Sequence, residues 1–101
     1  MARKLEPIHP GEIIFREFME PLELSQRALA RALGVPVTRI SKIVAGERGI
    51  TADTALRLGR YFKTSAEMWV NMQAGYDLRV ARRENEKAIM KEVKPITKGA
   101  A

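Results

Sequence analysis

Two hydroxyl and two cationic side chains lie within one stretch of five residues: Thr38, Arg39, Ser41 and Lys42. A guanidinium presents N–H donors in a fixed plane that match the edge of a guanine, and an ammonium binds phosphate as a point charge. Hydroxyl groups contact either bases or phosphates. If this stretch is helical, its side chains predict binding to nucleic acid.

The sequence offers little for catalysis or for a metal site. It contains no cysteine and a single histidine, His9, which is interpreted as a surface or capping residue. Ser25 and Thr51 are interpreted as helix caps, because neither has a nearby base that would activate a nucleophile. The three glutamates of residues 12–20 are interpreted as a solvated face, since no second type of ligand accompanies them. We therefore expect neither an enzyme nor a bound cofactor or metal.

Turn and cap residues divide the chain into helical segments, and strand-like alternation is not sustained anywhere. Within each segment the apolar residues recur at three- and four-residue steps, as on the buried face of a helix. The expected helices begin at or directly after Pro10, Ser25, Pro36, Thr51 and Ser65. The sequence thus predicts an all-α fold of five helices, the last of them extended to about Lys91.

The last two helices carry the most extensive apolar faces. The fourth helix is expected to bury Ala55, Leu56, Leu58, Tyr61 and Phe62. The fifth carries a stripe of methionine and aromatic residues that includes Met68, Trp69 and Met72. This stripe is interpreted as core, with a surface for a partner as the alternative, because five short helices cannot all bury their apolar faces internally.

Residues 26–45 carry the pattern of a helix-turn-helix. A small residue, Ala30, stands where two helices cross closely, and Gly34 supplies the positive φ that the turn requires. Val35 fills the space behind the turn. The contact between the two helices is expected from Leu29, Leu33, Ile40 and Ile43.

The outward side of the second helix of this motif is the candidate site. In a major groove, Arg39 would form a bidentate contact with guanine, Thr38 a polar or methyl contact, and Val37 an apolar contact with a thymine methyl group. Both Thr38 and Arg39 must then be exposed to solvent. Phosphate contacts are expected from Gln26, Lys42 and Arg48. The full set of expected DNA-binding residues is Gln26, Pro36, Val37, Thr38, Arg39, Ser41, Lys42 and Arg48.

Length and charge agree with this interpretation. The 101 residues suffice for one domain with a tail, and the net charge of +6 favours a polyanionic partner. Residues 25–49 carry five lysines or arginines against one acidic residue, and residues 76–101 carry seven against four. No apolar run approaches the length of a membrane span, and the first residues do not form a signal-peptide core. A cytoplasmic protein is expected.

Two sets of segments resemble a known family. The first is SQRALA (25–30), LGV (33–35), ISKI (40–43) and Gly46, which resembles the phage-repressor-like (XRE) helix-turn-helix family. The second is HPGE (9–12), ITADTALRL (50–58), TSAEMWVNMQ (64–73) and YDL (76–78), which resembles the HigA/VapI antidote subfamily. The resemblance implies a lambda-repressor-like DNA-binding domain over residues 8–83, with its helix-turn-helix at 26–45. The resemblance does not extend to residues 84–101, which from their own composition are expected to form a basic C-terminal helical extension and flexible tail.

The resemblance also implies a function, that of an antitoxin in a type II toxin–antitoxin system. Such a protein binds and neutralises a small basic mRNA-cleaving toxin of the HigB/RelE type, encoded by the adjacent gene. It also represses its own operon as a homodimer on a palindromic operator of double-stranded DNA. The chain departs from the family at Ala45, where many members have a phosphate-binding asparagine, and at Val37, where phage repressors often have glutamine. The alternative is a stand-alone XRE-family transcriptional regulator without a toxin partner, which shares all these features except the antidote-like flanks.

Overall fold

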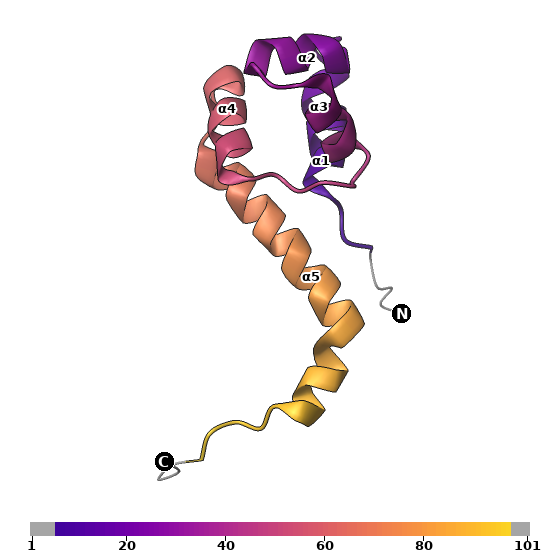
Figure 1. Cartoon of the computed structure of the whole chain (residues 1–101), viewed down its shortest axis with the longest axis vertical. Coiled ribbons are helices and arrows are strands. Elements are labelled where there is room, and N and C mark those ends of the chain that lie inside the picture. The colour runs from indigo at the N-terminus through magenta and orange to yellow at the C-terminus, as the bar shows by residue number, and fades with distance from the viewer. Residues whose placement is uncertain (1–5, 98–101) are drawn as a thin grey trace.

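The computed structural model describes residues 6–97, which form helices joined by short turns (Figure 1). The elements are α1 (Pro10–Ile13), η1 (Ile14–Met19), α2 (Gln26–Leu33), α3 (Val37–Val44), α4 (Ala52–Phe62) and α5 (Ala66–Glu92). Because α1 runs directly into η1, the two form one continuous helix, and the predicted all-α fold of five helices is confirmed. The end of the expected flexible tail, residues 98–101, lies outside the described residues.

Side-chain caps fix where four of the helices begin. Ser25, Thr51 and Ser65 each accept a hydrogen bond from the backbone N–H three residues later, at 3.0, 3.3 and 3.1 Å. His9 caps α1 in the same way, because its Nδ1 accepts the N–H of Gly11 at 2.9 Å. A side-chain acceptor at this position satisfies an N–H group that the helix itself leaves without a partner. The predicted capping roles of Ser25 and Thr51 are confirmed.

The first helix widens before it ends. The N–H of Glu20 bonds to the carbonyl of Phe15 at 2.9 Å, five residues back, and the N–H of Leu24 reaches Met19 at 2.8 Å in the same pattern. Such bonding defines a π-helical turn, which is rare and short in proteins. Ile14 and Met19, also five residues apart, are both buried in the core. The chain then turns at residues 20–23 toward α2.

The predicted helix-turn-helix is present in α2 and α3. Gly34 ends α2 with a φ of 70°, and the N–H of Val35 bonds back to the carbonyl of Ala30 at 3.0 Å. This left-handed glycine lets the chain leave α2 and enter α3 within three residues. All the expected contact residues between the helices are buried: Leu29, Ala30, Leu33, Ile40 and Ile43. Pro36 is the N-cap of α3 rather than a residue of its first turn.

α1 crosses α3 at very close range. A Cβ atom placed on Gly11 would lie 1.8 Å from the carbonyl oxygen of Ile43 and 3.0 Å from the Cα of Val44. Only a residue without a side chain therefore fits at position 11, because the atoms that it faces are backbone. This contact supports the C-terminal end of α3.

The buried face of α4 is narrower than the sequence predicts. Ala55 and Leu58 are fully buried, but Leu56 is 65% exposed and Tyr61 40% exposed. Residues 55 and 56 point about 100° apart on a helix, so both cannot face the same neighbour. The expectation that Leu56 and Tyr61 belong to the core is therefore wrong.

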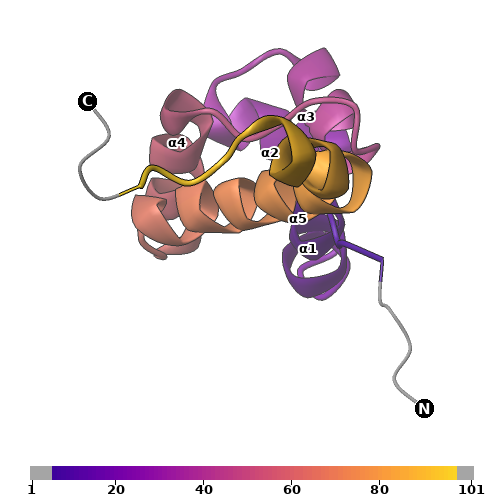
Figure 2. The ribbon, with the colours of Figure 1, turned by 90° about the horizontal axis from the view of Figure 1, so that it is seen from below.

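α5 packs against the core through one side of its first half, whereas its second half is exposed. Trp69 is fully buried in the core, as expected, and its indole N–H donates to the hydroxyl of Thr64 at 2.8 Å. Every residue from Arg82 to Thr97 is exposed. This part of the chain extends away from the other helices (Figure 1), so that in the view from below it lies in front of them (Figure 2). α5 passes through the expected boundary at residue 83 without a break.

Candidate nucleic-acid interface

α3 presents an exposed edge on which polar and basic groups are aligned. Thr38 and Lys42 lie one helical turn apart and are both exposed, so the expectation for Thr38 is confirmed. Pro36, directly before α3, and Arg48, in the turn after it, are also exposed. This edge thus offers one hydroxyl and two cationic groups to a partner.

Gln26 and Ser41 are half-buried and contact each other. The hydroxyl of Ser41 donates to Oε1 of Gln26 at 2.6 Å, and its Oγ lies 3.1 Å from the carbonyl oxygen of Val37. Because Gln26 is the first residue of α2, this bond joins the start of α2 to the middle of α3. The Nε2 donors of Gln26 are then left for another acceptor. Ser41, one of the expected DNA-binding residues, thus bonds through its hydroxyl within the motif.

Val37 and Arg39 are also less exposed than expected. Val37 packs against the edge of the hydrophobic core. The side chain of Arg39 is 25% exposed, and its Nη1 donates to Oδ2 of Asp53 at 3.2 Å. Its Nε is buried and has no hydrogen-bond partner. The expectation of a solvent-exposed Arg39 is therefore corrected: its side chain lies along the flank of α3 that faces α4, where its aliphatic stem is covered and its guanidinium meets a carboxylate.

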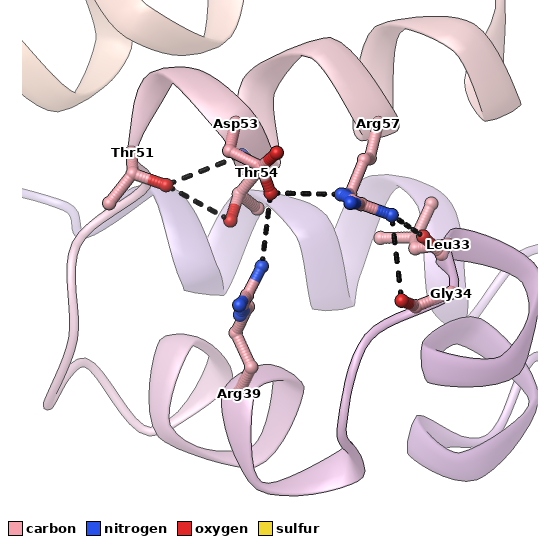
Figure 3. Close-up of polar contacts among 7 residues, drawn as sticks. All are labelled: Leu33, Gly34, Arg39, Thr51, Asp53, Thr54 and Arg57. Carbon is pink, nitrogen blue, oxygen red and sulfur yellow. Dashed lines mark hydrogen bonds and ion pairs between the residues drawn. The ribbon is translucent and has the colours of Figure 1, made fainter.

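Asp53 and Arg57 form a network that connects α4 with both helices of the motif (Figure 3). Oδ2 of Asp53 accepts from Nε of Arg57 at 2.8 Å as well as from Arg39. Nη1 of Arg57 continues to the carbonyl oxygens of Leu33 and Gly34, at 2.8 and 3.5 Å. The hydrogen bond from Arg57 lowers the pKa of Asp53, and the second guanidinium acts in the same direction, so the carboxylate stays ionised.

Only the Asp53–Arg57 pair of this network could be predicted from the sequence. Asp53 and Arg57 have the four-residue spacing of a helical ion pair, with the acid on the N-terminal side. Their contacts with Arg39 and with the end of α2 depend on how α4 docks, which no local pattern specifies. Neither residue was among the expected site residues.

The turn after α3 is held by α5. Gly46 adopts a φ of 78°, and the N–H of Ile50 donates to Oε1 of Gln73 at 2.8 Å. Nε2 of Gln73 donates in turn to Oδ1 of Asp77 at 3.0 Å. This second bond fixes the orientation of the Gln73 amide, with its oxygen toward Ile50. These bonds from α5 limit the movement of the segment that carries Arg48. Gln73 and Asp77 belong to the segments that carry the antidote-like resemblance, and here they serve structure.

His9 lies where the N-terminal segment meets this turn and α5. Its ring packs edge-on against Tyr76 with centroids 4.9 Å apart, and a Cβ on Gly46 would be 3.8 Å from its Cγ. Burial lowers the pKa of His9, and the carboxylate of Asp77 opposes this shift to a smaller extent. The expected capping role of His9 is confirmed.

Residues 6–97 show neither a metal-binding cluster nor a membrane-spanning helix. No group of three or more histidine, aspartate or glutamate side chains is arranged to hold a metal ion there. Over the same residues, no helix combines the length and the apolar character that crossing a membrane requires.

Comparison with known proteins places this geometry in a family. The helix-turn-helix family model matches residues 15–69, which contain α2, α3 and α4. Virulence-associated protein I of Dichelobacter nodosus is 52% identical over 83 residues, which are 82% of this chain and 77% of that protein. Antitoxin HigA-1 of Vibrio cholerae is 36% identical over 94 residues, which are 92% of this chain and 87% of that protein.

Among solved structures, the antitoxin HigA of Pseudomonas aeruginosa with the higBA promoter superposes with a TM-score of 0.87. It is 49% identical, and the match covers 90% of this chain and 99% of that one. The likeness thus includes the full helix-turn-helix and most of α5. The chain belongs to the phage-repressor-like (XRE) helix-turn-helix family, in the group that contains the HigA antitoxins.

Proposed function

We propose that this chain is the antitoxin of a type II toxin–antitoxin system that represses its own operon by binding operator DNA. The observation that carries the proposal is the exposed edge of α3, where Thr38 and Lys42 stand one turn apart on a helix held by a helix-turn-helix. A helix of this kind fits the major groove, and residues near its start reach the bases. Support comes from the HigA antitoxin of P. aeruginosa, whose structure was solved with its promoter. Such a role places the chain in the cytoplasm and gives it no catalytic activity.

The proposed contacts with DNA are of two kinds, those with phosphates and those with bases. Lys42 and Arg48 are exposed cations that bind phosphates, and Gln26 adds a phosphate contact through its Nε2 donors. Thr38 and Arg39 contact base edges, and Val37 and Pro36 approach the bases from the start of α3. Ser41 acts mainly by holding Gln26 in place.

The proposal includes a homodimer on a palindromic operator. From its middle to the residue after its end, α5 leaves apolar side chains without cover: Leu78, Ile89, Met90 and Val93 are each about half exposed or more. Pairing of two copies along this face would bury them and set two recognition helices one turn of DNA, about 34–36 Å, apart. A chain that stays monomeric at micromolar concentration in analytical ultracentrifugation would contradict this part.

The proposal also includes a small basic toxin of the HigB/RelE type as partner. The support is membership of the HigA group and the antidote-like segments 64–73 and 76–78. Co-expression with the product of the adjacent gene, followed by affinity purification, tests it. Recovery of both chains, together with relief of the growth arrest that the neighbour causes alone, is expected. If the two chains do not co-purify and the growth arrest is not relieved, the alternative of a stand-alone regulator without a toxin partner is supported.

Gel-shift titration with promoter DNA from upstream of the chain's own gene tests DNA binding. Arg39→Ala is expected to lose about 1–3 kcal/mol on this DNA and little on a scrambled duplex. Lys42→Ala is expected to weaken both duplexes about equally and to lower the salt slope by about one unit. The wild-type chain must prefer the promoter. Equal affinity for promoter and scrambled DNA would contradict the proposed function.

A further inference from the structure

Asp53 stands at the second position of α4, outside the helix-turn-helix, yet it bonds to Arg39, the side chain to which the proposed function assigns a base contact. Its Oδ2 accepts from Nη1 of Arg39 at 3.2 Å and from Nε of Arg57 at 2.8 Å. Figure 3 shows the carboxylate between the two guanidinium groups, one from α3 and one from its own helix. Asp53 is therefore well placed to act through Arg39.

The two arginines are bound to different degrees. Arg57 is held at three points, by Asp53 and by the carbonyl oxygens of Leu33 and Gly34. Among residues 6–97, Arg39 has a single partner, Asp53, and its buried Nε has none. Since an open ion pair is weak and a buried donor without a partner is unfavourable, Arg39 is the exchangeable member of the network. Asp53 stays beside Arg39 because its place is set by its position near the start of α4.

Burial and the ion pair together restrict where Arg39 can point. Its Nε is buried, and its Nη1 donates to Asp53. Only the other N–H groups of the guanidinium are therefore left for an external acceptor. A restrained guanidinium contacts acceptors in one direction, whereas a free arginine reaches phosphates over a wide arc. The first behaviour favours a particular base and the second favours any DNA.

We propose that Asp53 is a specificity-determining residue, which restrains Arg39 so that the guanidinium contacts a base edge in place of any nearby phosphate. The proposal rests on the proposed operator binding and adds to it a positioning residue outside the helix-turn-helix. Asp53 itself touches no DNA in this arrangement and acts through Arg39.

The test measures the ratio of affinities for the promoter duplex and for a scrambled duplex of the same composition. Asp53→Asn keeps the size of the side chain and removes its charge. It is expected to lower this ratio about tenfold, within the range that one base contact contributes, mainly by strengthening binding to scrambled DNA. The salt slope on scrambled DNA should steepen by about one unit, because Arg39 gains a phosphate.

Two controls separate the restraint of Arg39 from simple charge effects. In an Arg39→Ala background, Asp53→Asn should leave the ratio unchanged. Glu47→Gln removes one negative charge from the exposed turn after α3 without touching Arg39 and should also leave the ratio unchanged. If Asp53→Asn changes the ratio equally with and without Arg39, or not at all, the proposal is overturned.

A third variant distinguishes loss of the restraint on Arg39 from a general loss of stability. Arg57→Ala removes the other partner of Asp53 and the bonds to the end of α2, but leaves Arg39 and Asp53 together. It should lower the melting temperature at least as much as Asp53→Asn and keep the ratio. If Arg57→Ala lowers the ratio as much as Asp53→Asn does, general loosening of α4 explains the effect and the proposal fails. A wild-type chain that shows no preference for the promoter would instead refute the proposed function.

Discussion

Substituting Gly11 tests the packing that supports α3. In Gly11→Ala, the new Cβ would lie 1.8 Å from the carbonyl oxygen of Ile43 and 2.6 Å from its carbonyl carbon. Both are backbone atoms within α3, so no side chain can rotate away, and α1 and α3 must separate by roughly 1 Å. Overpacking of this kind costs typically 1–3 kcal/mol, and we expect about 3 kcal/mol because only backbone can yield. For a chain of this size that loss lowers the melting temperature by about 12–24 °C.

Gly75→Ala is the matched control for this substitution. Gly75 lies within α5, and a Cβ there would meet nothing within 4 Å. Alanine should therefore stabilise the chain by about 0.5–1 kcal/mol through its better helix propensity. Thermal unfolding followed by circular dichroism at 222 nm measures both variants at one protein concentration. A Gly11→Ala variant that melts within about 2 °C of the wild-type chain would refute the close crossing of α1 and α3.

Three further experiments test other parts of the fold. His9→Asn keeps a capping acceptor but does not titrate. Because burial lowers the pKa of His9 below 6.5, the free energy of unfolding of the wild-type chain should fall as the pH drops from about 7 to 5.5. The free energy of unfolding of the variant should change less over the same range. An identical pH dependence in urea titrations would show that His9 does not contribute. Leu58→Ala should cost about 2–5 kcal/mol and Leu56→Ala under about 0.5 kcal/mol, and equal losses by chemical denaturation would contradict the assigned face of α4. Trp69→Phe should cost about 1–3 kcal/mol because the hydroxyl of Thr64 loses its donor, and a double-mutant cycle with Thr64→Val should return a coupling energy above zero.

The helices could be predicted from the sequence because their signals are local. Ser25, Thr51 and Ser65 each bond to an amide three residues later, so their effect depends on neither docking nor burial elsewhere. The turn at Gly34 is local in the same sense, since only glycine adopts its φ of 70° without strain. Leu56 shows the limit of this information. Its apolar character marks it as a core candidate, but only the position of the neighbouring helices decides that Ala55 and Leu58 are covered while Leu56 is not.

The candidate site could be predicted in position but not in arrangement. The helix-turn-helix pattern locates α3 and correctly predicts that Thr38 is exposed. The pattern does not show that Arg39 meets Asp53, because these residues are fourteen positions apart and approach each other only once α4 has packed beside the motif. The same holds for Gln73, whose bond to Ile50 spans 23 positions and fixes the turn after α3.

These long-range bonds explain why a motif of twenty residues needs a whole domain around it. Lys42 is exposed and has a flexible stem, which is enough for a phosphate contact that tolerates small changes in direction. A contact with a base edge has stricter geometry, so the group that makes it must be directed by its surroundings. Arg39 is directed by α4, and the turn that follows α3 is directed by α5. It follows from the proposed base contact of Arg39 that a substitution in α4 that releases this side chain, such as Asp53→Asn, should alter the choice of DNA sequence more than the overall affinity for DNA.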